Sequence, residues 1–185
     1  IGSHCHRHFS KNNEVWHCDI LPSERDTNYF LIDPTLPDFA AVFRAQPFDI
    51  CINCSGSANV SDSFKNPNKD FEQNVINVQR ILEAIRRHNP DCHYINLSSA
   101  AVYGNTAQLP IQENQRTQAI SPYGYHKKLA EDLCKQFTEL YDLKTFLIRI
   151  CSAYGPVLKK QLFWDLFKNL SKSEITLHPR GNETR

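Results

Sequence analysis

The spacing of apolar residues along the chain switches repeatedly between a strand-like and a helix-like period. Short apolar or alternating runs, which are typical of β-strands, occupy residues 14–20, 29–32, 48–53, 93–97 and 144–150, with one more near Ile175. Apolar residues three and four positions apart, which are typical of amphipathic helices, occupy residues 2–11, 71–88, 122–141 and 162–170. Strands that alternate with helices of this length predict an α/β domain with a mostly parallel sheet and helices on both faces.

Prolines and small residues help to place the boundaries of these elements. Pro37 and Pro122 can each occupy the first turn of a helix, where a missing N–H is harmless. After Pro37, apolar side chains line one face of a short helix, at Phe39, Val42 and Phe43. The longer helix at 71–88 carries its apolar stripe at Phe71, Val75, Val78, Ile81, Leu82 and Ile85. Residues 54–57 (CSGS) predict a tight turn directly after the strand at 48–53.

Composition narrows the class of protein further. The chain has 185 residues, of which 41% are apolar, so it can build one α/β domain with a proper core but not two of ordinary size. The formal net charge of +1 favours neither nucleic acid nor membrane as a partner. No apolar run approaches the ~20 residues that span a bilayer. The odd number of cysteines, seven, shows no disulfide-framework spacing and predicts a cytoplasmic protein with reduced thiols.

Three polar side chains have the spacing of a catalytic group. Ser99 follows a predicted strand, at the carboxyl end where open α/β sheets place their ligands. Tyr123 and Lys127 are four residues apart on the next predicted helix, so they share one face. A lysine ammonium beside a tyrosine hydroxyl stabilises the phenolate and is expected to lower its pKa from ~10, which makes the tyrosine a usable base. Ser99 would then orient the reacting hydroxyl.

The Tyr-x-x-x-Lys pattern alone has an ordinary alternative. It arises by chance in many helices, where the tyrosine merely lies over a lysine stem. Here Tyr123 follows the strand-end Ser99 by 24 residues (123 − 99), within the expected alternation of strands and helices. The combination is specific where the single motif is not.

These motifs resemble those of the extended short-chain dehydrogenase/reductase family, in particular the NAD-dependent epimerase/dehydratase group and its nucleotide-sugar 4-epimerases. The resemblance covers essentially the whole chain and rests on residues 98–104 (SSAAVYG), 121–127 (SPYGYHK) and 149–156 (RICSAYGP). It implies a Rossmann-like, doubly wound parallel sheet. In such a sheet the strand order is 3-2-1-4-5-6, and a cofactor binds at the carboxyl ends of the strands.

Both ends of the chain resemble interior segments of that family. Residues 1–4 (IGSH) resemble the end of its Gly-rich phosphate turn, and residues 181–185 (GNETR) resemble the segment before its substrate-domain strand. We therefore expect residues 1–185 to form an NAD(P)-binding Rossmann domain that is incomplete at both ends, without its first strand or the C-terminal substrate domain. The two strands that flank the missing one would lose their shared partner, so the isolated chain is expected to be poorly stable, to bind NAD weakly and to lack epimerase activity.

Asp19 bears on the choice of cofactor. It closes the first predicted strand, where an acid accepts hydrogen bonds from the adenosine ribose and repels a 2′-phosphate, which favours NAD over NADP. The alternative is an ordinary turn aspartate. By resemblance, Asp33 and Pro34 border the adenine, and Asn74 either contacts the cofactor or braces the turn beneath it. The resemblance also implies cofactor contacts at Ile1, Gly2, Cys54, Ser55, Gly56, Cys151 and the three residues Ser99, Tyr123 and Lys127.

The residues after Ser99 discriminate among reactions within the family. Dehydrating, decarboxylating and double-epimerising relatives carry acids or a cysteine where this chain has Ala100 and Ala101, so oxidation and reduction at one carbon remain. By resemblance, the substrate contacts are Ser99, Tyr123, Ser152 and, at a nucleotide-sugar diphosphate, Arg185. Ser152 replaces an asparagine of many sugar epimerases, which leaves the identity of the sugar open.

No metal site is predicted. Cys51 and Cys54 have a zinc-like spacing, but they lie on a predicted buried strand without a second pair. A group of histidines near Cys5 likewise lacks a partner cluster.

The resemblance favours an NAD-dependent nucleotide-sugar 4-epimerase that is a homodimer when complete. Two alternatives stay open: a nucleotide-4-keto-sugar reductase, which would ordinarily use NADPH, and a non-catalytic cofactor-binding fragment of the same family.

Overall fold

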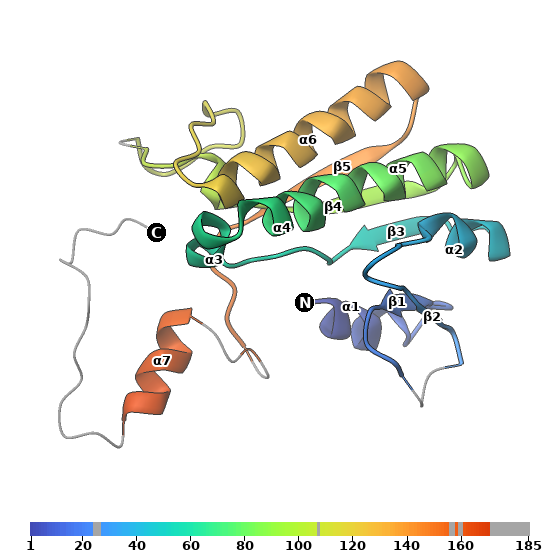
Figure 1. Ribbon diagram of the computed structural model, residues 1–185, viewed down its shortest axis with the longest axis horizontal. Coiled ribbons are helices and arrows are strands. Elements are labelled where there is room, and N and C mark those ends of the chain that lie inside the picture. The colour runs from blue at the N-terminus through green and yellow to red at the C-terminus, as the bar shows by residue number, and fades with distance from the viewer. Residues whose placement is uncertain (24–26, 107, 156–157, 159–160, 171–185) are drawn as a thin grey trace. The chain divides into compact units, whose positions relative to one another are not determined.

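The computed structural model describes residues 1–23, 27–106, 108–155, 158 and 161–170. The chain divides into two compact units, Ile1–Arg149 and Ile150–Arg185. Helices and strands alternate along the first unit, as the hydrophobic periods predict (Figure 1).

Four elements form the N-terminal part of the first unit: α1 (Gly2–Phe9), β1 (His17–Asp19), β2 (Tyr29–Leu31) and α2 (Phe39–Ala45). The part that follows contains β3 (Ile50–Asn53), α3 (Val60–Lys65), α4 (Pro67–Phe71), a π-helical turn (Glu72–Ile76), α5 (Asn77–His88), β4 (His93–Ser99), a 3₁₀ turn (Ala100–Val102), α6 (Pro122–Tyr141) and β5 (Thr145–Ile150). In the second unit, α7 spans Gln161–Asn169.

The described strands form two sheets. β1 pairs in parallel with β2, with Asp19 opposite Leu31. β3 pairs in parallel with β4, with Asn53 opposite Asn96, and β4 also neighbours β5. In a Rossmann sheet of order 3-2-1-4-5-6, β1 and β3 would both pair with a strand between them. No described strand joins these two parallel sheets, and the fold is α/β and Rossmann-like.

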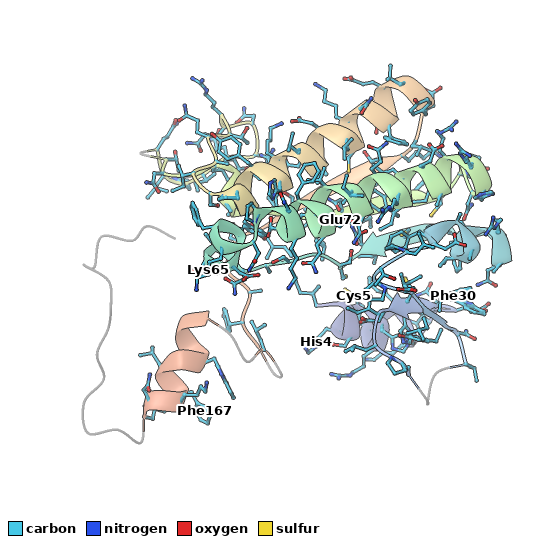
Figure 2. All side chains as sticks on the ribbon, viewed as in Figure 1. His4, Cys5, Phe30, Lys65, Glu72 and Phe167 are labelled. Atoms are coloured by element: carbon cyan, nitrogen blue, oxygen red, sulfur yellow. The ribbon has the colours of Figure 1, made fainter. Side chains whose placement is uncertain are left out.

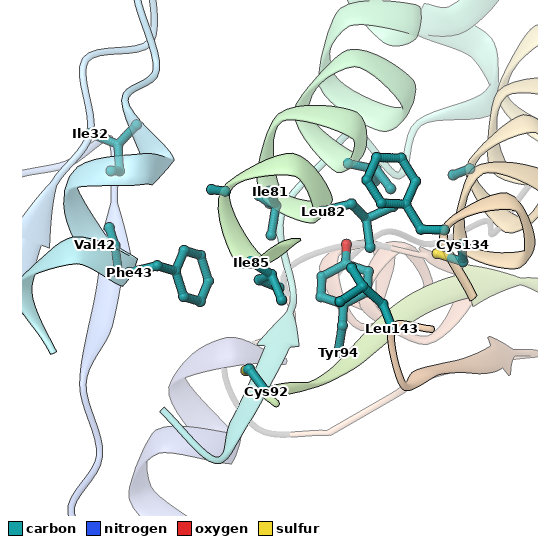
Figure 3. Packing of buried hydrophobic residues seen from close by; sticks show 14 residues of the cluster. Ile32, Val42, Phe43, Ile81, Leu82, Ile85, Cys92, Tyr94, Cys134 and Leu143 are labelled. Carbon is teal, nitrogen blue, oxygen red and sulfur yellow. The ribbon is translucent and has the colours of Figure 1, made fainter. Parts of the chain in front are cut away.

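Most of the hydrophobic core is built by α2, α5, α6 and β4, with α2 packed against α5. Leu82 and Ile85 of α5 are fully buried, as are Tyr94 of β4 and Cys134 of α6 (Figure 3). The apolar stripe of α5 thus faces the core, because residues three and four apart share one side of a helix. By contrast, α1 buries none of its residues and β1 none of its three.

The alternation of side chains along β4 decides what its end presents. Tyr94, Asn96 and Ser98 are buried on one face, whereas the residues between them are half-buried on the other. Ser98 therefore lies on the buried face of β4 and Ser99 on the other face, because neighbouring side chains of a strand lie on opposite faces.

Several boundaries differ from those predicted. β1 is shorter than residues 14–20, and β4 includes both serines that were expected to follow it. Pro37 lies outside α2, whose N-cap is Asp38, since the carboxylate of Asp38 accepts a hydrogen bond from the N–H of Ala41 at 3.0 Å. The strand predicted near Ile175 lies outside the described residues.

The helix predicted at 71–88 is divided. α4 begins it, a π-helical turn follows, and α5 completes it. Figure 2 shows Glu72, the first residue of the π-helical turn, on the helix that leads into α5. Such a turn inserts an extra residue into the helical repeat and is frequent at functional sites.

Candidate functional site

Ser99 and Tyr123 come together at the carboxyl end of β4. The hydroxyl of Ser99 caps the 3₁₀ turn by accepting a hydrogen bond from the N–H of Ala101 at 3.2 Å. The hydroxyl of Ser99 also lies near enough to the hydroxyl of Tyr123 to lower the pKa of Tyr123. Tyr123 is 7% exposed, so its ring is packed into the protein and its hydroxyl is held beside Ser99.

Local contacts at the start of α6 explain why Tyr123 lies there. Ser121 is the N-cap and accepts a hydrogen bond from the N–H of Gly124 at 3.1 Å. The N–H of Tyr123, which has no partner within the helix, donates to the hydroxyl of Ser63 at 3.2 Å. A Cβ on Gly124 would lie 2.7 Å from the carbonyl oxygen of Ala101, so glycine permits this close approach.

Lys127 lies one turn further along α6 and is buried. Its Nζ donates to the carbonyl oxygen of Leu97 at 3.0 Å and lies 5.9 Å from the centre of the Tyr123 ring. An ammonium has three N–H donors, of which this hydrogen bond uses one. Lys127 therefore anchors α6 to β4 and retains donors for other groups.

The electrostatics differ from those predicted for this pair. Burial raises the pKa of Tyr123 above its ordinary value, the hydrogen bond from Ser99 opposes that rise, and the charge of Asp70 adds to it. Burial lowers the pKa of Lys127, and Asp70 opposes that change. Desolvation therefore outweighs the effect that the sequence led us to expect, and Tyr123 is a neutral phenol at neutral pH.

The predicted cofactor turn follows β3. Gly56 has φ +103°, and a Cβ there would lie 2.5 Å from Oδ1 of Asn74. Asn74, in the π-helical turn, is 1% exposed, and neither its Nδ2 nor its Oδ1 has a hydrogen-bond partner within the described part of the chain. A buried polar side chain without a partner costs free energy, which suits a site that a ligand completes.

Ser55 is tied to the same turn from the strand side. Its N–H and its hydroxyl both donate to Oδ1 of Asn53, at 3.0 and 2.6 Å. Nδ2 of Asn53 in turn donates to the hydroxyl of Tyr94 at 2.9 Å. This polar network links the turn to the buried side chains of Asn53 and Tyr94 and so helps to fix its conformation.

The start of α1 lies against the end of β3. Ile1 is its N-cap, and the Ile1 carbonyl accepts hydrogen bonds from the N–H groups of His4 and Cys5. A Cβ on Gly2 would lie 3.4 Å from the Cβ of Cys54, which is ordinary contact. Burial, with a smaller contribution from Cys5, raises the pKa of the Cys54 thiol to about 11, so Cys54 is a packing residue and not a thiolate at neutral pH.

The two aspartates predicted to border the adenosine lie beyond the ends of adjacent strands. Asp19 ends β1, and its exposed carboxylate accepts a hydrogen bond from the N–H of Ile20 at 2.7 Å. Asp33 follows β2, and hydrogen bonds from Thr35 lower the pKa of its carboxyl. Pro34 is exposed beside it. β1 and β2 are parallel, so both acids lie at the same edge of their sheet.

Three further predicted site residues lie in the second unit or outside the described residues. Cys151 and Ser152 are exposed and lie in the second unit. Arg185 lies outside the described residues. Within the described ranges, no three His, Cys, Asp or Glu side chains are grouped so that they could hold a metal ion. None of the described helices combines the length and the apolar character that a membrane span requires.

One hydrogen bond and one ion pair between side chains near the site were not predicted. Nδ1 of His126 lies 2.6 Å from Oδ2 of Asp70, and Glu131 of α6 binds Arg149 of β5. Glu131 could have been suspected, since it lies four residues after Lys127 on the same face of α6. The partners could not, because they come from distant segments.

Comparisons with known proteins show the family and the fold of the chain. The model of the NAD dependent epimerase/dehydratase family matches residues 1–185. A Methanocaldococcus jannaschii protein with the provisional name UDP-glucose 4-epimerase is 30% identical over 165 residues, which cover 84% of this chain and 53% of that protein. The UDP-glucuronate 4-epimerase 6 of Arabidopsis thaliana is 28% identical over 131 residues, or 69% of this chain and 28% of that protein. The chain thus spans about half the length of these curated relatives or less.

A solved structure extends the likeness to the fold. UDP-glucuronic acid 4-epimerase from Bacillus cereus, in complex with UDP-glucuronic acid and NAD, superposes with a TM-score of 0.80 at 22% identity. The superposition covers 91% of this chain and 59% of that one. It supports the Rossmann-like architecture over nearly all of the chain.

Proposed function

Because the chain belongs to the NAD dependent epimerase/dehydratase family, we propose that it forms the cofactor-binding and catalytic half of an NAD-dependent nucleotide-sugar 4-epimerase. The observation that carries the proposal is the arrangement of Ser99, Tyr123 and Lys127 at the carboxyl end of β4. It combines a hydroxyl donor, a buried phenol and a cation in one place, which is what proton removal from a sugar hydroxyl needs.

Tyr123 is the general base in this proposal. It takes the proton of the sugar 4-hydroxyl and later returns it, while Ser99 donates a hydrogen bond that orients the reacting oxygen. The raised pKa of Tyr123 has to fall for this role. Lys127, together with the positive charge that oxidised NAD would bring, would lower it, since nearby cations favour the phenolate.

The residues of the chain fit NAD. When bound, NAD would accept the hydride from the sugar carbon and return it to the opposite face. Gly56, at a turn where a Cβ does not fit, lets the backbone approach the cofactor closely, and Asn74 beneath it has unused polar atoms. Ile1, Gly2, Cys54 and Ser55 would line the phosphate side, with Asp19, Asp33 and Pro34 on the adenosine and Cys151 on the nicotinamide.

Reaction at C4 is the finer part of the proposal. The relatives include the CDP-paratose 2-epimerase of Salmonella typhi, 29% identical over 123 residues, so family membership leaves the carbon open. Ala100 and Ala101 leave the strand end without a carboxylate next to Ser99, which argues against dehydration and favours simple oxidation and reduction. The substrate would be a nucleotide sugar held also by Ser152 and Arg185, in a homodimer of the complete protein in the cytoplasm.

The test is a panel of nucleotide sugars incubated with NAD and the protein expressed from its complete gene. We expect interconversion of one pair of C4 epimers without net formation of NADH. Chromatography separates and identifies the products. Net consumption of a reduced cofactor with a 4-keto sugar would instead support the reductase alternative. Cofactor binding without turnover of any sugar would support a non-catalytic role.

A further inference from the structure

A buried hydrogen-bond network lies directly behind the proposed catalytic residues. Its centre is the carboxylate of Glu131 on α6, which is 4% exposed. Oε1 accepts a hydrogen bond from the hydroxyl of Ser98 at 2.6 Å and from Nε of Arg149 at 2.8 Å. Oε2 accepts one from Nη2 of Arg149 at 2.7 Å. The Arg149–Glu131 pair is therefore bidentate, and such a pair fixes orientation as well as distance.

The network and the catalytic side chains share two elements. Ser98 adjoins Ser99 on β4, and Glu131 follows Lys127 by one helical turn on α6. α6 is thus tied to the last residues of β4 at two successive levels, Lys127 to the carbonyl oxygen of Leu97 and Glu131 to Ser98. Two hydrogen bonds from side chains one helical turn apart restrict both the translation and the rotation of α6 against β4.

Arg149 extends the same network to the segment between β4 and α6. Nη1 donates to the hydroxyl of Tyr103 at 2.7 Å and to the carbonyl oxygen of Glu113 at 2.8 Å. The guanidinium also lies 4.8 Å from the centre of the Tyr103 ring. One side chain of β5 therefore holds α6 and two points of the loop before α6, Tyr103 at its start and Glu113 near its middle. The hydrogen bonds to Glu131 and Tyr103 raise the pKa of Arg149 above its ordinary value, so it stays charged.

We propose that Glu131 and Arg149 are a positioning pair, which sets the register of α6 on β4 and thereby keeps Tyr123 within hydrogen-bonding reach of Ser99. The proposal rests on the proposed function for what Tyr123 does, but the geometry that it explains does not depend on the substrate. Neither residue touches the reacting atoms. The pair acts through the interaction between the hydroxyls of Ser99 and Tyr123, which depends on the position of α6 against β4.

The test is a double-mutant cycle in the protein expressed from its complete gene. Glu131→Gln keeps the shape of the side chain but removes its charge. We expect it to lower kcat by about 10-fold with KM changed by less than about 2-fold, because positioning acts in the transition state. In a Ser99→Ala background the same substitution is expected to have almost no further effect on kcat, since the contact that it protects is already gone.

The titration of Tyr123 gives a readout that does not need turnover. The ultraviolet spectrum of each variant is followed against pH, and the Tyr123 signal is the difference from a matched Tyr123→Phe protein. Because the hydrogen bond from Ser99 lowers the pKa of Tyr123, its weakening in Glu131→Gln should move the titration to higher pH. The acidic limb of the pH profile of kcat should move in the same direction.

Ser98→Ala is the milder variant, since it removes one donor to Glu131 and leaves the ion pair with Arg149 intact. It should shift the Tyr123 titration in the same direction by a smaller amount, and it serves as the test if Glu131→Gln folds poorly. Glu83→Gln, which removes an ion pair on α5 far along the chain, is the matched control and should leave the titration unchanged. Additive effects of Glu131→Gln and Ser99→Ala, or an unshifted Tyr123 titration, would overturn the proposal. A protein without epimerase activity but with the shifted titration would refute the proposed function and leave the positioning pair standing.

Discussion

The proposed catalytic site at the end of β4 and the proposed adenosine site at the ends of β1 and β2 are built in different ways. At the end of β4, Tyr123, Lys127 and Glu131 are buried and each has a hydrogen-bond partner from another element. At the ends of β1 and β2, the carboxylates of Asp19 and Asp33 are exposed, and their side-chain hydrogen bonds come from neighbours within two residues in sequence.

The difference separates a pre-organised region from one that a ligand has to order. Long-range contacts hold the catalytic groups before any substrate arrives, which removes the cost of orienting them during the reaction. The carboxylates of Asp19 and Asp33 are held by hydrogen bonds from near neighbours in sequence. Binding of a dinucleotide should therefore stabilise the ends of β1 and β2 far more than the end of β4. The predictions below test that contrast.

The largest effect is expected at Tyr123. Tyr123→Phe removes the hydroxyl and keeps the buried ring, so kcat of the complete protein should fall by about 10²–10⁴-fold, the usual contribution of a general base. The Kd for NAD should stay within about 3-fold, since the ring of residue 123 and the other proposed cofactor contacts remain. Tyr125→Phe, on the same helix but 60% exposed, is the control. A Tyr123→Phe variant with near wild-type kcat would contradict the proposed mechanism.

The next effect concerns stability. Leu82 of α5 is fully buried in the core beside the strand end, whereas Leu21 after β1 is 68% exposed. Leu82→Ala should lower the free energy of unfolding by about 2–5 kcal/mol, and Leu21→Ala should change it by less than about 0.5 kcal/mol. Chemical denaturation of both variants measures the contrast. Equal losses would mean that the N-terminal part is packed as tightly as the core.

Asp19 is expected to produce a smaller effect, confined to the cofactor. A carboxylate at the end of β1 repels the 2′-phosphate of NADP, so NAD should bind at least about 10-fold more tightly, or ~1.4 kcal/mol. Asp19→Asn should reduce that preference, whereas Asp33→Asn should not. The two dissociation constants can be measured by calorimetry. Tighter binding of NADP to the unmodified protein would reverse the assignment and strengthen the reductase alternative.

The smallest effect is expected on α5. Hydrogen bonds and charges from Arg86 and Arg87 lower the pKa of Glu83 to about 2 from its ordinary value of 4.5. A depressed pKa stabilises the folded state above the ordinary value, and that stabilisation is lost as the pH falls from about 4.5 through about 2. Because these side chains are partly exposed, Glu83→Gln should cost less than about 1 kcal/mol at pH 7 and nothing near pH 2. Urea unfolding at both pH values tests this difference.

The order of helices and strands could be predicted because the spacing of apolar residues differs between helices and strands. In each element this spacing places the apolar side chains on the face that packs against the protein. α6 has the predicted bounds, since Ser121 and Pro122 begin it and Asp142, at φ 57°, ends it in the left-handed conformation. The short β1 and the π-helical turn could not be predicted. The first depends on where a partner strand pairs, and the second on one extra residue within a helical repeat.

Within the site, the proximity of Ser99, Tyr123 and Lys127 followed from their places on a strand end and one helix face. The raised pKa of Tyr123 did not, because desolvation depends on side chains that pack around the ring in three dimensions. The Glu131–Arg149 pair joins residues 18 apart on different elements, and no local pattern marks such a contact.

The division of the described strands into two sheets has a consequence for how this chain behaves in solution. Within the described residues, β1 and β3 each have one sheet neighbour, so each has an edge whose backbone groups are not used by another described strand. Unpaired edges of this kind act as templates for any extended peptide, including a second copy of the same chain. The light scattered per unit mass of residues 1–185 should therefore increase with protein concentration, because the chains associate. A soluble peptide that adds a strand to such an edge should suppress that increase.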